Sequence, residues 1–354
     1  MSGKEWWRPE IFASRKNNLA IRAKVVAATR AFFAARDFAE VETPCLQVSP
    51  GMEPHLKAFT TALVDPYGGP DQELALHTSP EFAMKKLLVA GMPRLYQLAR
   101  VFRNAERSPT HHPEFTMLEW YRAGAGLAEL MEDTEALVRA CCTVAGTALL
   151  RRDGAACDPF VPWRRLSVAE AFRDYADIDI LATAPDPHAP DRALLAVEAG
   201  RIGISVSRTD RWDDIFFKIM LDRIEPHLGH DGVPVFLHSY PVSMAALSRP
   251  SPRDPRIAER FEAYALGVEL ANAFGELTDS TEQRRRFEAD MALKQELYGV
   301  RHPVDEDFLA ALDFGMPEAA GIALGFDRLV MLLTGAATIE EVLWAPVAGG
   351  ETAK

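Results

Sequence analysis

Two segments that lie far apart in the sequence constrain this chain most, VFRNAERSPTHHPEFTMLEWY at 101–121 and GIALGFDRL at 321–329. The first joins Arg103, a run of charged and turn-forming residues, and an apolar–acidic–aromatic segment from Phe115 to Tyr121, which together predict a hairpin-like unit. The second alternates small and apolar residues before Arg328. A planar guanidinium offers fixed donors to phosphate oxygens and can lie flat on an aromatic base. A single arginine is more often an exposed surface residue, but two that approach one site from opposite ends of a domain suit a polyphosphate.

Length and composition are those of an ordinary globular protein. The 354 residues and 39.2 kDa allow one large domain or two small ones with a buried core. Hydrophobic residues make up 48% and charged residues 25% of the chain. The formal net charge of −12 argues against a broad nucleic-acid-binding surface and suits a basic protein partner better.

The cysteines and the termini indicate a reducing compartment. Among the four cysteines there is no CxxC pair and no metal-ligand spacing, and the adjacent Cys141 and Cys142 are predicted to be buried thiols. The N-terminal MSGKEWWRPE has no apolar stretch of signal-peptide length, and no segment approaches the length of a membrane span. We therefore expect a cytoplasmic protein that does not associate with membranes.

The N-terminal region predicts a tail, a helix and a strand. Residues 1–18 are polar apart from two tryptophans and are predicted to be a tail. Residues 21–38 have the apolar period of a helix, and EVETP then predicts a strand that Pro44 ends. An amphipathic helix of this kind suits a core and a subunit interface equally. We expect Phe32 and Phe33 to lie beside a strand edge that a lone subunit would leave exposed.

The remainder, residues 19–354 as a whole, predicts one mixed α+β domain. Strands are expected in PVFLHSYPVSMAAL and in FEAYALGVELANAFGELTD. A helical insertion at about 150–230 contains the Pro- and Asp-rich segment 182–193, which predicts an exposed loop. Further helices are expected at 81–89, at 127–150 and at 280–299, the last opened by a Ser or Thr cap.

The motifs resemble a known family. VFRN…HHPEFTMLEWY resembles motif 2 of the class II aminoacyl-tRNA synthetases, GIALGFDRL resembles motif 3, and RAFFAARDFAEVETP at 30–44 resembles motif 1. HTSPEFAMKKLLVAG at 77–91 is similar to the lysyl-specific branch, and within that branch to the short paralogues that modify elongation factor P. The similarity covers roughly residues 19–343, with the motifs in family order. It implies the class II catalytic fold, an antiparallel sheet flanked by helices, in a homodimer.

The resemblance also implies an activity. It predicts an ATP-dependent ligase that uses Mg²⁺, adenylates (R)-β-lysine or lysine, and transfers it to a lysine side chain of elongation factor P. Full lysyl-tRNA synthetases carry an N-terminal OB-type barrel, which needs about 70 to 100 residues. Only residues 1–18 precede the motif 1 helix here, so we expect no anticodon-binding domain and no tRNA substrate.

Two other functions stay open on the sequence alone. One is a synthetase that charges tRNA without an anticodon domain, against which the net charge counts. The other is a non-catalytic paralogue that only senses an amino acid. Such a paralogue would lack phosphate ligands, whereas Arg103, Glu269, Glu276 and Arg328 are all present.

The resemblance implies an ATP site with a catalytic pair of arginines. Arg103 would bind the α-phosphate, Phe115 would stack on adenine, and Arg328 would cover the other face and reach the terminal phosphates. By its alternating context alone, Phe115 would be a core residue. The full set of implied ATP ligands is Arg103, Asn104, Ala105, Glu106, His112, Phe115, Glu269, Leu270, Gly325 and Arg328.

The chain departs from the motif 2 pattern at Ala105, where the family has a glutamate. Either Glu106 replaces it through a shifted turn, or Asn104 and the backbone hold the nucleotide. His111 and His112 lie in the same loop, and an isolated loop histidine is usually solvated. His112 stands where the family more often has asparagine, so we expect it to contact ATP.

Glu269 and Glu276 are the predicted magnesium ligands. Mg²⁺ prefers a few carboxylates together with substrate phosphates and water. The two acids are seven residues apart in a predicted strand, and this odd spacing places them on opposite faces unless a bulge intervenes. Whether they converge on one metal stays open at this stage.

The implied amino-acid pocket is rich in carboxylates. Its predicted residues are Ser79, Pro80, Glu81, Glu119, Tyr121, Glu276 and Ala323. Three acids in one apolar pocket are costly unless cations fill it, and this favours a substrate with two ammonium groups. Ala323 stands where lysyl-tRNA synthetases usually have glycine. Its methyl group either favours the β-amino isomer or is a packing group without influence on selectivity.

Overall fold

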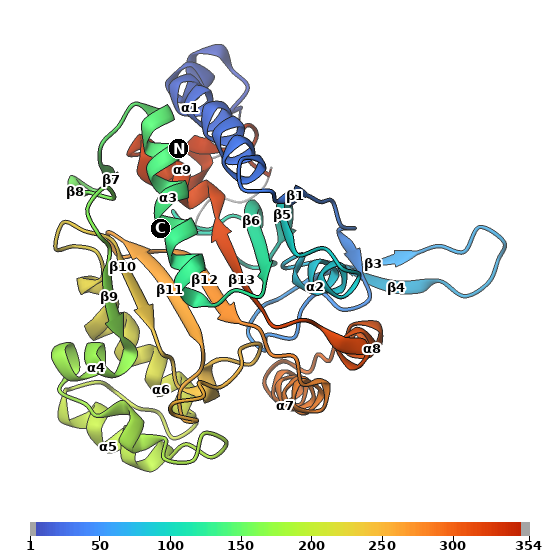
Figure 1. Cartoon of the computed structure of the whole chain (residues 1–354), viewed down its shortest axis with the longest axis vertical. Helices are drawn as coiled ribbons and strands as arrows, with labels where there is room; N and C mark the ends of the chain where they lie inside the picture. Colours follow the sequence, from blue (N-terminus) through green and yellow to red (C-terminus); the bar gives the residue numbers. More distant parts are fainter. Residues whose placement is uncertain (1–4, 348–354) are drawn as a thin grey trace.

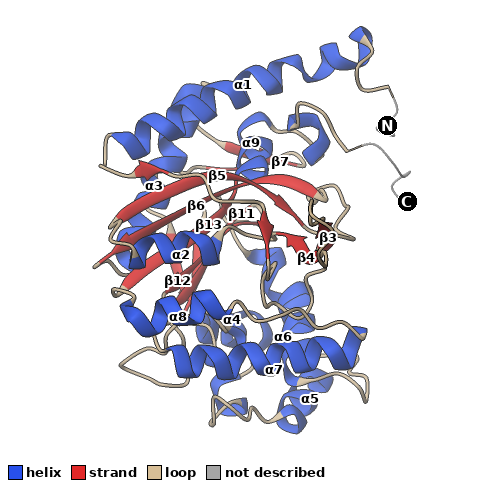
Figure 2. Ribbon diagram, turned by 90° about the vertical axis from the view of Figure 1, so that its right-hand side faces the viewer, coloured by secondary structure: helices blue, strands red, loops and turns tan. Residues whose placement is uncertain are grey.

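An eight-stranded sheet forms the middle of the molecule (Figure 1 and Figure 2). The computed structural model describes residues 5–347. Neighbouring strands are antiparallel except for the β1/β5 and β9/β10 pairs at the two edges, which are parallel. In spatial order the strands are β1 (Ala39–Glu40), β5 (Arg94–Phe102), β6 (Glu114–Ala123), β13 (Ala319–Gly325), β12 (Val268–Gly275), β11 (Arg260–Ala265), β10 (Val235–His238) and β9 (Arg164–Ser167).

Helices cover both faces of this sheet. On one face lie α1 (Pro9–Ala34), α3 (Leu127–Ala145) and α9 (Phe326–Thr334), and on the other lie α2 (Glu81–Val89), α7 (Ser280–Tyr298) and α8 (Glu306–Gly315) (Figure 2). In the first layer Phe33 of α1 stacks on Tyr96 of β5 with ring centroids 4.4 Å apart. In the second layer Phe82 of α2 stacks on Phe308 of α8 at 4.7 Å. The predicted α+β class, a largely antiparallel sheet flanked by helices, is confirmed.

A second core lies in the segment after β9. It is built from α4 (Val168–Ala176), α5 (Arg192–Arg201) and α6 (Trp212–Ile219), with the short turns η1 (Ile180–Thr183), η2 (Met220–Ile224) and η3 (Glu225–His227). Phe172 stacks on Phe216 at 4.9 Å in its centre. Of the loop predicted at 182–193, residues 184–191 form no helix or strand, whereas its two ends belong to η1 and α5.

The smaller elements complete the chain. A three-stranded sheet consists of β2 (Leu46–Gln47), β4 (Gln72–Leu76) and β3 (Phe59–Leu63), and the β3–β4 hairpin projects away from the body (Figure 1). β7 (Leu150–Arg152) and β8 (Ala155–Cys157) pair with each other. Two further short helical turns are η4 (Val242–Met244) and η5 (Ile339–Val342).

The N-terminal helix is longer than predicted, and its aromatic residues lie inside the subunit. α1 begins at Pro9, a residue type suited to the first helical turn, so residues 9–18 are helical rather than part of a tail. The apolar pattern misses this turn because its buried residue, Arg15, is polar. Phe32 and Phe33 are 6% and 0% exposed in the single chain, so both rings are already covered within the subunit.

Several predicted boundaries also shift. α7 is capped by Asp279, whose carboxylate accepts from the backbone N–H of Glu282 at 3.0 Å, and not by a Ser or Thr. α3 ends at Ala145 instead of Leu150, because Gly146 turns the chain at a φ of 73°. The buried thiols of Cys141 and Cys142 are confirmed, each with 0% exposure.

Candidate active site

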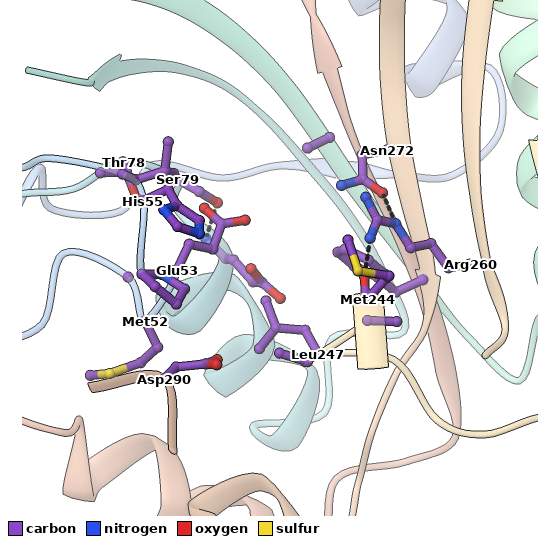
Figure 3. A pocket seen from close by; sticks show the side chains of 18 of the residues that line it. Met52, Glu53, His55, Thr78, Ser79, Met244, Leu247, Arg260, Asn272 and Asp290 are labelled. Carbon is purple, nitrogen blue, oxygen red and sulfur yellow. Dashed lines mark hydrogen bonds between the residues drawn. The ribbon is translucent and has the colours of Figure 1, made fainter. Parts of the chain in front are cut away.

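A cavity of about 1100 Å³ lies over the sheet face opposite α1, α3 and α9. Alternation along β13 separates the two faces, since Ile322 and Leu324 join the core under the helices while Gly321 and Ala323 line the cavity. The loop around 49–56, α7 and the loops near 188 and 211 form the walls. Figure 3 shows Ser79 on one side of the cavity and Arg260 with Asn272 on the other.

The floor consists of cross-strand rows whose register the sheet fixes. One row runs from Glu119 on β6 through Ala323 on β13 and Asn272 on β12 to Glu262 on β11. The neighbouring row runs through Tyr121, Gly321, Phe274 and Arg260. Residues directly opposite each other in adjacent strands have close Cβ atoms, so Ala323 lies between Glu119 and Asn272. The predicted amino-acid ligands from motifs 2 and 3 therefore meet on one surface.

A buried lysine that sequence reasoning missed, Lys85, pairs with two carboxylates of the acidic pocket. Lys85 Nζ lies 2.5 Å from Glu81 Oε1 on the same helix and 2.5 Å from Glu276 Oε2 after β12. Lys85 and Glu276 are each 1% exposed, and Glu81 is 16% exposed. Burial lowers the pKa of Lys85, but Glu276 and then Glu81 outweigh this and raise it above its ordinary value. The i, i+4 spacing of Glu81 and Lys85 is the signal that could have indicated the pair.

Glu119 lies beside this ion pair and is held by two hydroxyl groups. Ser79 Oγ donates to Glu119 Oε1 at 2.5 Å and Tyr121 Oη donates to Glu119 Oε2 at 3.0 Å. Burial, followed by the charge of Glu81, raises the pKa of Glu119 to about 8. Burial also raises the pKa of Glu276 to about 7, although Lys85 opposes the shift. Burial is the main cause of both shifts, and the charge of Glu81 adds to each of them.

Glycine is required beneath these carboxylates. A Cβ at Gly321 would lie 2.2 Å from a ring atom of Tyr121 and 2.4 Å from Glu276 Oε1. This oxygen of Glu276 is buried and makes no hydrogen bond within residues 5–347. Within that range Glu276 Oε1 is therefore an acceptor without a donor, and Gly321 below it leaves space in which a donor group of a ligand could lie.

The opposite end of the cavity carries the two predicted arginines. The Arg103 guanidinium lies 5.3 Å from the centre of the Phe115 ring, and its Nε is buried without a hydrogen bond in the described chain. Arg328 is oriented by several acceptors, among them the carbonyl oxygen of Glu269 at 2.9 Å from Nη1. Its Nη2 donates to His111 Nε2 at 2.7 Å. Because arginine has only donors, His111 is neutral with its proton on Nδ1, in keeping with a pKa lowered to about 4 by burial and then by Arg328.

The two histidines of the motif 2 loop both line the cavity but have different partners. His112, the predicted ATP contact, is 2% exposed and uses both ring nitrogens within the chain. Nδ1 lies 2.5 Å from the carbonyl oxygen of Glu114, and Nε2 accepts from the backbone N–H of Val347 at 3.2 Å. Both ring nitrogens of His112 thus have partners in the described chain, and its contact with ATP stays a prediction; His111 lines the same cavity beside Arg328.

Motif 2 departs from its pattern in a strained turn. Ala105 adopts a φ of 65°, which is uncommon for a residue other than glycine, and its N–H donates to the Asn104 side chain at 2.8 Å. Neither Asn104 nor Ala105 lines the cavity, but Glu106 does. Of the two alternatives left open by the sequence, this placement favours Glu106.

A β-bulge brings Glu269 to the cavity. Ala263 pairs with Ala271 but Tyr264 pairs with Glu269, so Leu270 is an extra residue on β12. The side chain of Leu270 is buried in the core under the helices, and Glu269 takes the cavity face instead, where its side chain is 41% exposed. The bulge that the odd spacing required is therefore present.

The bulge does not bring Glu269 and Glu276 to one point. Glu276 pairs with Lys85, whereas Arg328 lies 3.8 Å from Glu269. The acid with the largest influence on Glu269 is Glu262 on β11. Burial first, and then the charge of Glu262, raises the pKa of Glu269. Glu262 Oε2 accepts from Tyr240 at 2.5 Å and from Tyr264 at 2.6 Å. Sequence reasoning missed Glu262 because it took the segment 261–279 without locating its hairpin turn, at Leu266 and Gly267.

All predicted site residues except Asn104 and Ala105 line this one cavity. The structure adds His111 and Glu262 to the lining, and it places Lys85 behind the lining, paired with Glu81 and Glu276. In residues 5–347 no group of three His, Cys, Asp or Glu side chains could by itself hold a metal ion. No helix in the same range is long and apolar enough to cross a membrane.

The chain belongs to the class II tRNA synthetases (D, K and N), whose family model matches residues 11–348. Its curated relatives include the elongation factor P–(R)-β-lysine ligase of Yersinia enterocolitica, 39% identical over 98% of this chain and 99% of the relative. The ligases of the same name from Proteus mirabilis and Klebsiella pneumoniae are 38% and 39% identical. These alignments cover 96% and 97% of this chain and 97% and 98% of the respective relatives.

Proposed function

We propose that this protein uses ATP and Mg²⁺ to adenylate a lysine-like diamino acid, (R)-β-lysine or lysine, and transfers it to a lysine side chain of elongation factor P. The observation that carries the proposal is the acidic pocket beside two arginines. Glu81, Glu119 and Glu276 are opposed by the single cation of Lys85. A diamino acid brings the two positive charges that such a pocket lacks.

Adenylation requires positioning and charge stabilisation rather than covalent help from the protein. The carboxylate of the amino acid attacks the α-phosphorus of ATP. The bond between the α-phosphorus and the oxygen that bridges to the β-phosphate breaks, and pyrophosphate leaves. Arg103, with its buried and unpaired Nε, would bind the α-phosphate. Phe115 would stack on adenine. Arg328, fixed by His111, would cover the opposite side of the nucleotide.

The residues around the bulge fit a magnesium ion that substrate phosphates help to hold. The Glu269 carboxylate accepts no hydrogen bond within the described chain, and Glu262 lies on the adjacent strand. Mg²⁺ needs only one or two carboxylates when phosphates and water complete its shell. We therefore retain Glu269 as a proposed ligand, add Glu262, and assign Glu276 to the amino-acid pocket. When bound, the ion would neutralise charge on the triphosphate.

In the transfer step the amine of an acceptor lysine attacks the acyl carbon of the adenylate. The carbon–oxygen bond to AMP breaks, and the attacking nitrogen loses a proton. The choice of elongation factor P as acceptor follows the names of the relatives. The net charge of −12 supports a protein acceptor over tRNA.

The test is reconstitution from purified components. The chain, ATP, Mg²⁺ and (R)-β-lysine or lysine are incubated with elongation factor P, and the intact mass of the acceptor is measured. We expect one added aminoacyl group, and none on an acceptor whose modified lysine is replaced by arginine. A parallel gel assay with tRNA should show no charging. Charged tRNA with unmodified elongation factor P would overturn the proposal, and the absence of pyrophosphate exchange would favour a sensing paralogue.

The proposed assembly is a homodimer. Its support is the short edge strand β1, which pairs only with β5 within the described chain, and exposed apolar side chains nearby at Leu46 and Val48, 44% and 45% exposed. Sedimentation at micromolar concentration should give the mass of a dimer; a monomer would contradict this assignment.

A further inference from the structure

One cation, Lys85, lies behind the lining of the acidic pocket, and its position is unusual for a lysine. Lysine is among the residues least often fully buried unless it is paired. Lys85 is 1% exposed and contacts carboxylates from two elements, Glu81 on α2 and Glu276 after β12. The neighbouring Lys86 is the ordinary case, since it is 26% exposed and pairs with Asp305 and Asp307 outside the cavity.

The charges of the pocket define a deficit. Glu81, Glu119 and Glu276 together with the ammonium of Lys85 leave two uncompensated negative charges when all are ionised. Two further charges act on this group: Arg249 acts on Glu276 but is paired with Glu259, and Glu53 acts on Glu81 but also faces Arg103. Glu119 receives only neutral hydroxyl donors, from Ser79 and Tyr121, and Glu276 Oε1 receives no hydrogen bond in the described chain. Both of these carboxylates border the cavity beside Gly321. The deficit therefore faces the space where a substrate would lie.

We propose that Lys85 is a positioning residue for the amino-acid substrate: it holds Glu81 and Glu276 in place and fixes the charge deficit of the pocket at two, the number of ammonium groups that a diamino acid brings. This inference rests on the proposed function, since it takes the substrate to be a diamino acid. It assigns no contact between Lys85 and the reacting atoms.

The inference has a measurable consequence, which is that substrate binding releases protons. In the empty pocket the pKa values of Glu119 and Glu276 are raised, so these two carboxyl groups are partly protonated near neutral pH. Two ammonium groups favour the ionised carboxylates, so protons leave as the substrate enters. Without the charge of Lys85 a third carboxylate joins the deficit. More protons are then held by the empty pocket and more are released.

The experiment compares Lys85→Met with the wild type by calorimetry of (R)-β-lysine and of lysine binding at pH 7.5, in phosphate and in Tris. The difference in heat between buffers gives the number of protons released. We expect Lys85→Met to release about one proton more than the wild type, and the acid limb of its binding profile to move up by about one pH unit. Lys85→Arg, which keeps the charge, and Lys86→Met, the same change outside the cavity, should both match the wild type. An unchanged proton count in Lys85→Met, or an altered one in Lys85→Arg, overturns the inference.

A charge-conserving double variant covers the case in which Lys85→Met does not fold. Lys85→Met combined with Glu81→Gln removes the cation together with one carboxylate and returns the deficit to two. Its proton release should equal that of the wild type. A residue that only braced the helix would not be replaced in this way, so a different count contradicts the charge role.

A second arm needs no amino acid and separates this inference from the proposed function. When the pKa of a carboxyl group is higher in the folded than in the unfolded protein, the protonated group stabilises the fold. This stabilisation is complete at a pH below the pKa in the unfolded state and is lost as the pH rises through the pKa in the folded state. The melting temperature of Lys85→Met should therefore fall more steeply between pH 6 and 9 than that of the wild type or Lys86→Met. Parallel slopes overturn the charge role of Lys85, whereas a wild type that binds neither amino acid overturns the proposed function alone.

Discussion

Lys85 Nζ lies 2.5 Å from Glu276 Oε2, and only 1% of each side chain is exposed. The pair joins α2 to the end of β12 and so fixes a helix against the sheet at the edge of the cavity. Removing one partner of a buried pair typically costs about 3 to 5 kcal/mol, because the remaining charge is left without compensation. Activity measurements on variants of this pocket therefore require a parallel measurement of unfolding.

Arg103→Ala should abolish amino-acid-dependent pyrophosphate exchange in a folded protein. A charge-assisted contact that forms chiefly in the transition state is worth about 3 to 4 kcal/mol, which corresponds to hundreds-fold in rate. The exchange rate at saturating ATP checks this. Arg100→Ala, at an exposed position of β5 just before Arg103, is the control and should remain fully active. A loss smaller than about tenfold in Arg103→Ala would remove Arg103 from the role of α-phosphate ligand.

Glu269→Gln should raise the Mg²⁺ concentration needed for half-maximal exchange. The neutral amide keeps the shape of the side chain but removes the charge that a hard cation requires. The measurement is a magnesium titration at fixed ATP. Glu288→Gln, on an exposed position of α7 outside the cavity, should leave the titration unchanged. If Glu269→Gln and the wild type titrate alike, the metal assignment is wrong.

Acid should weaken the use of the amino acid. The pKa of Glu119 is raised to about 8 by burial and then by Glu81, and an ammonium group needs the ionised carboxylate. As the pH falls below 8, kcat/KM for the diamino acid should decrease and approach about tenfold per pH unit. Glu119→Gln should be less active overall, with a shallower dependence. A wild-type profile that is flat from pH 6 to 8 would falsify this role of Glu119.

Gly321→Ala should disrupt the amino-acid pocket. The new methyl group would lie 2.2 Å from Tyr121 and 2.4 Å from Glu276 Oε1, so these side chains have to move. Overpacking of this kind costs about 1 to 3 kcal/mol, and we expect a matching loss of affinity for the amino acid, with the KM for ATP little changed. Gly200→Ala in α5, where no atom lies within 4 Å of the new Cβ, is the matched control. Equal amino-acid affinity in both variants would contradict the packing argument.

Ala323→Gly should improve the use of lysine relative to (R)-β-lysine. The methyl group lies in the row between Glu119 and Asn272, where it crowds a substrate ammonium near the floor. A single methyl carries about 1 to 3 kcal/mol of discrimination, so a shift of roughly tens-fold is expected. The comparison is adenylation kcat/KM for both isomers, with Ala320→Gly on the opposite face of β13 as the control. An unchanged ratio leaves Ala323 as a packing residue.

The sequence was sufficient for the fold and for a set of residues that nearly all line one cavity, because the motifs carry both strands and their functional side chains. Glu119, Tyr121 and Ala323 are brought together by the β6/β13 register, which follows from two well-patterned strands. Helix α2 has the predicted bounds because its apolar face is regular. By contrast, the start of α1 was not predicted, because Arg15, the buried residue of its first turns, is polar and adds nothing to the apolar period.

What the sequence could not provide were pairings between distant polar side chains. Lys85 seemed an ordinary helix lysine until the fold placed Glu276 against it. His111 and His112 are adjacent in the chain, and only the positions of Arg328 and Val347 separate their roles. Likewise, Glu262 becomes a neighbour of Glu269 only through the hairpin that joins β11 to β12. Each of these contacts depends on tertiary register, which spacing along the chain does not determine.

The bulge at Leu270 makes the length of β12 as important as its composition. Strict alternation back from Asn272 with Leu270 retained would put Leu270 on the cavity face and turn Glu269 towards the helices, into an apolar layer. Because the bulge takes up Leu270, deletion of this residue would leave Glu269 on the cavity face and remove one buried side chain from the core. A residue inserted or deleted between Asn272 and Glu276, where the strand alternates regularly, should instead turn Glu269 and Glu276 to opposite faces, even though every polar side chain of the cavity is kept.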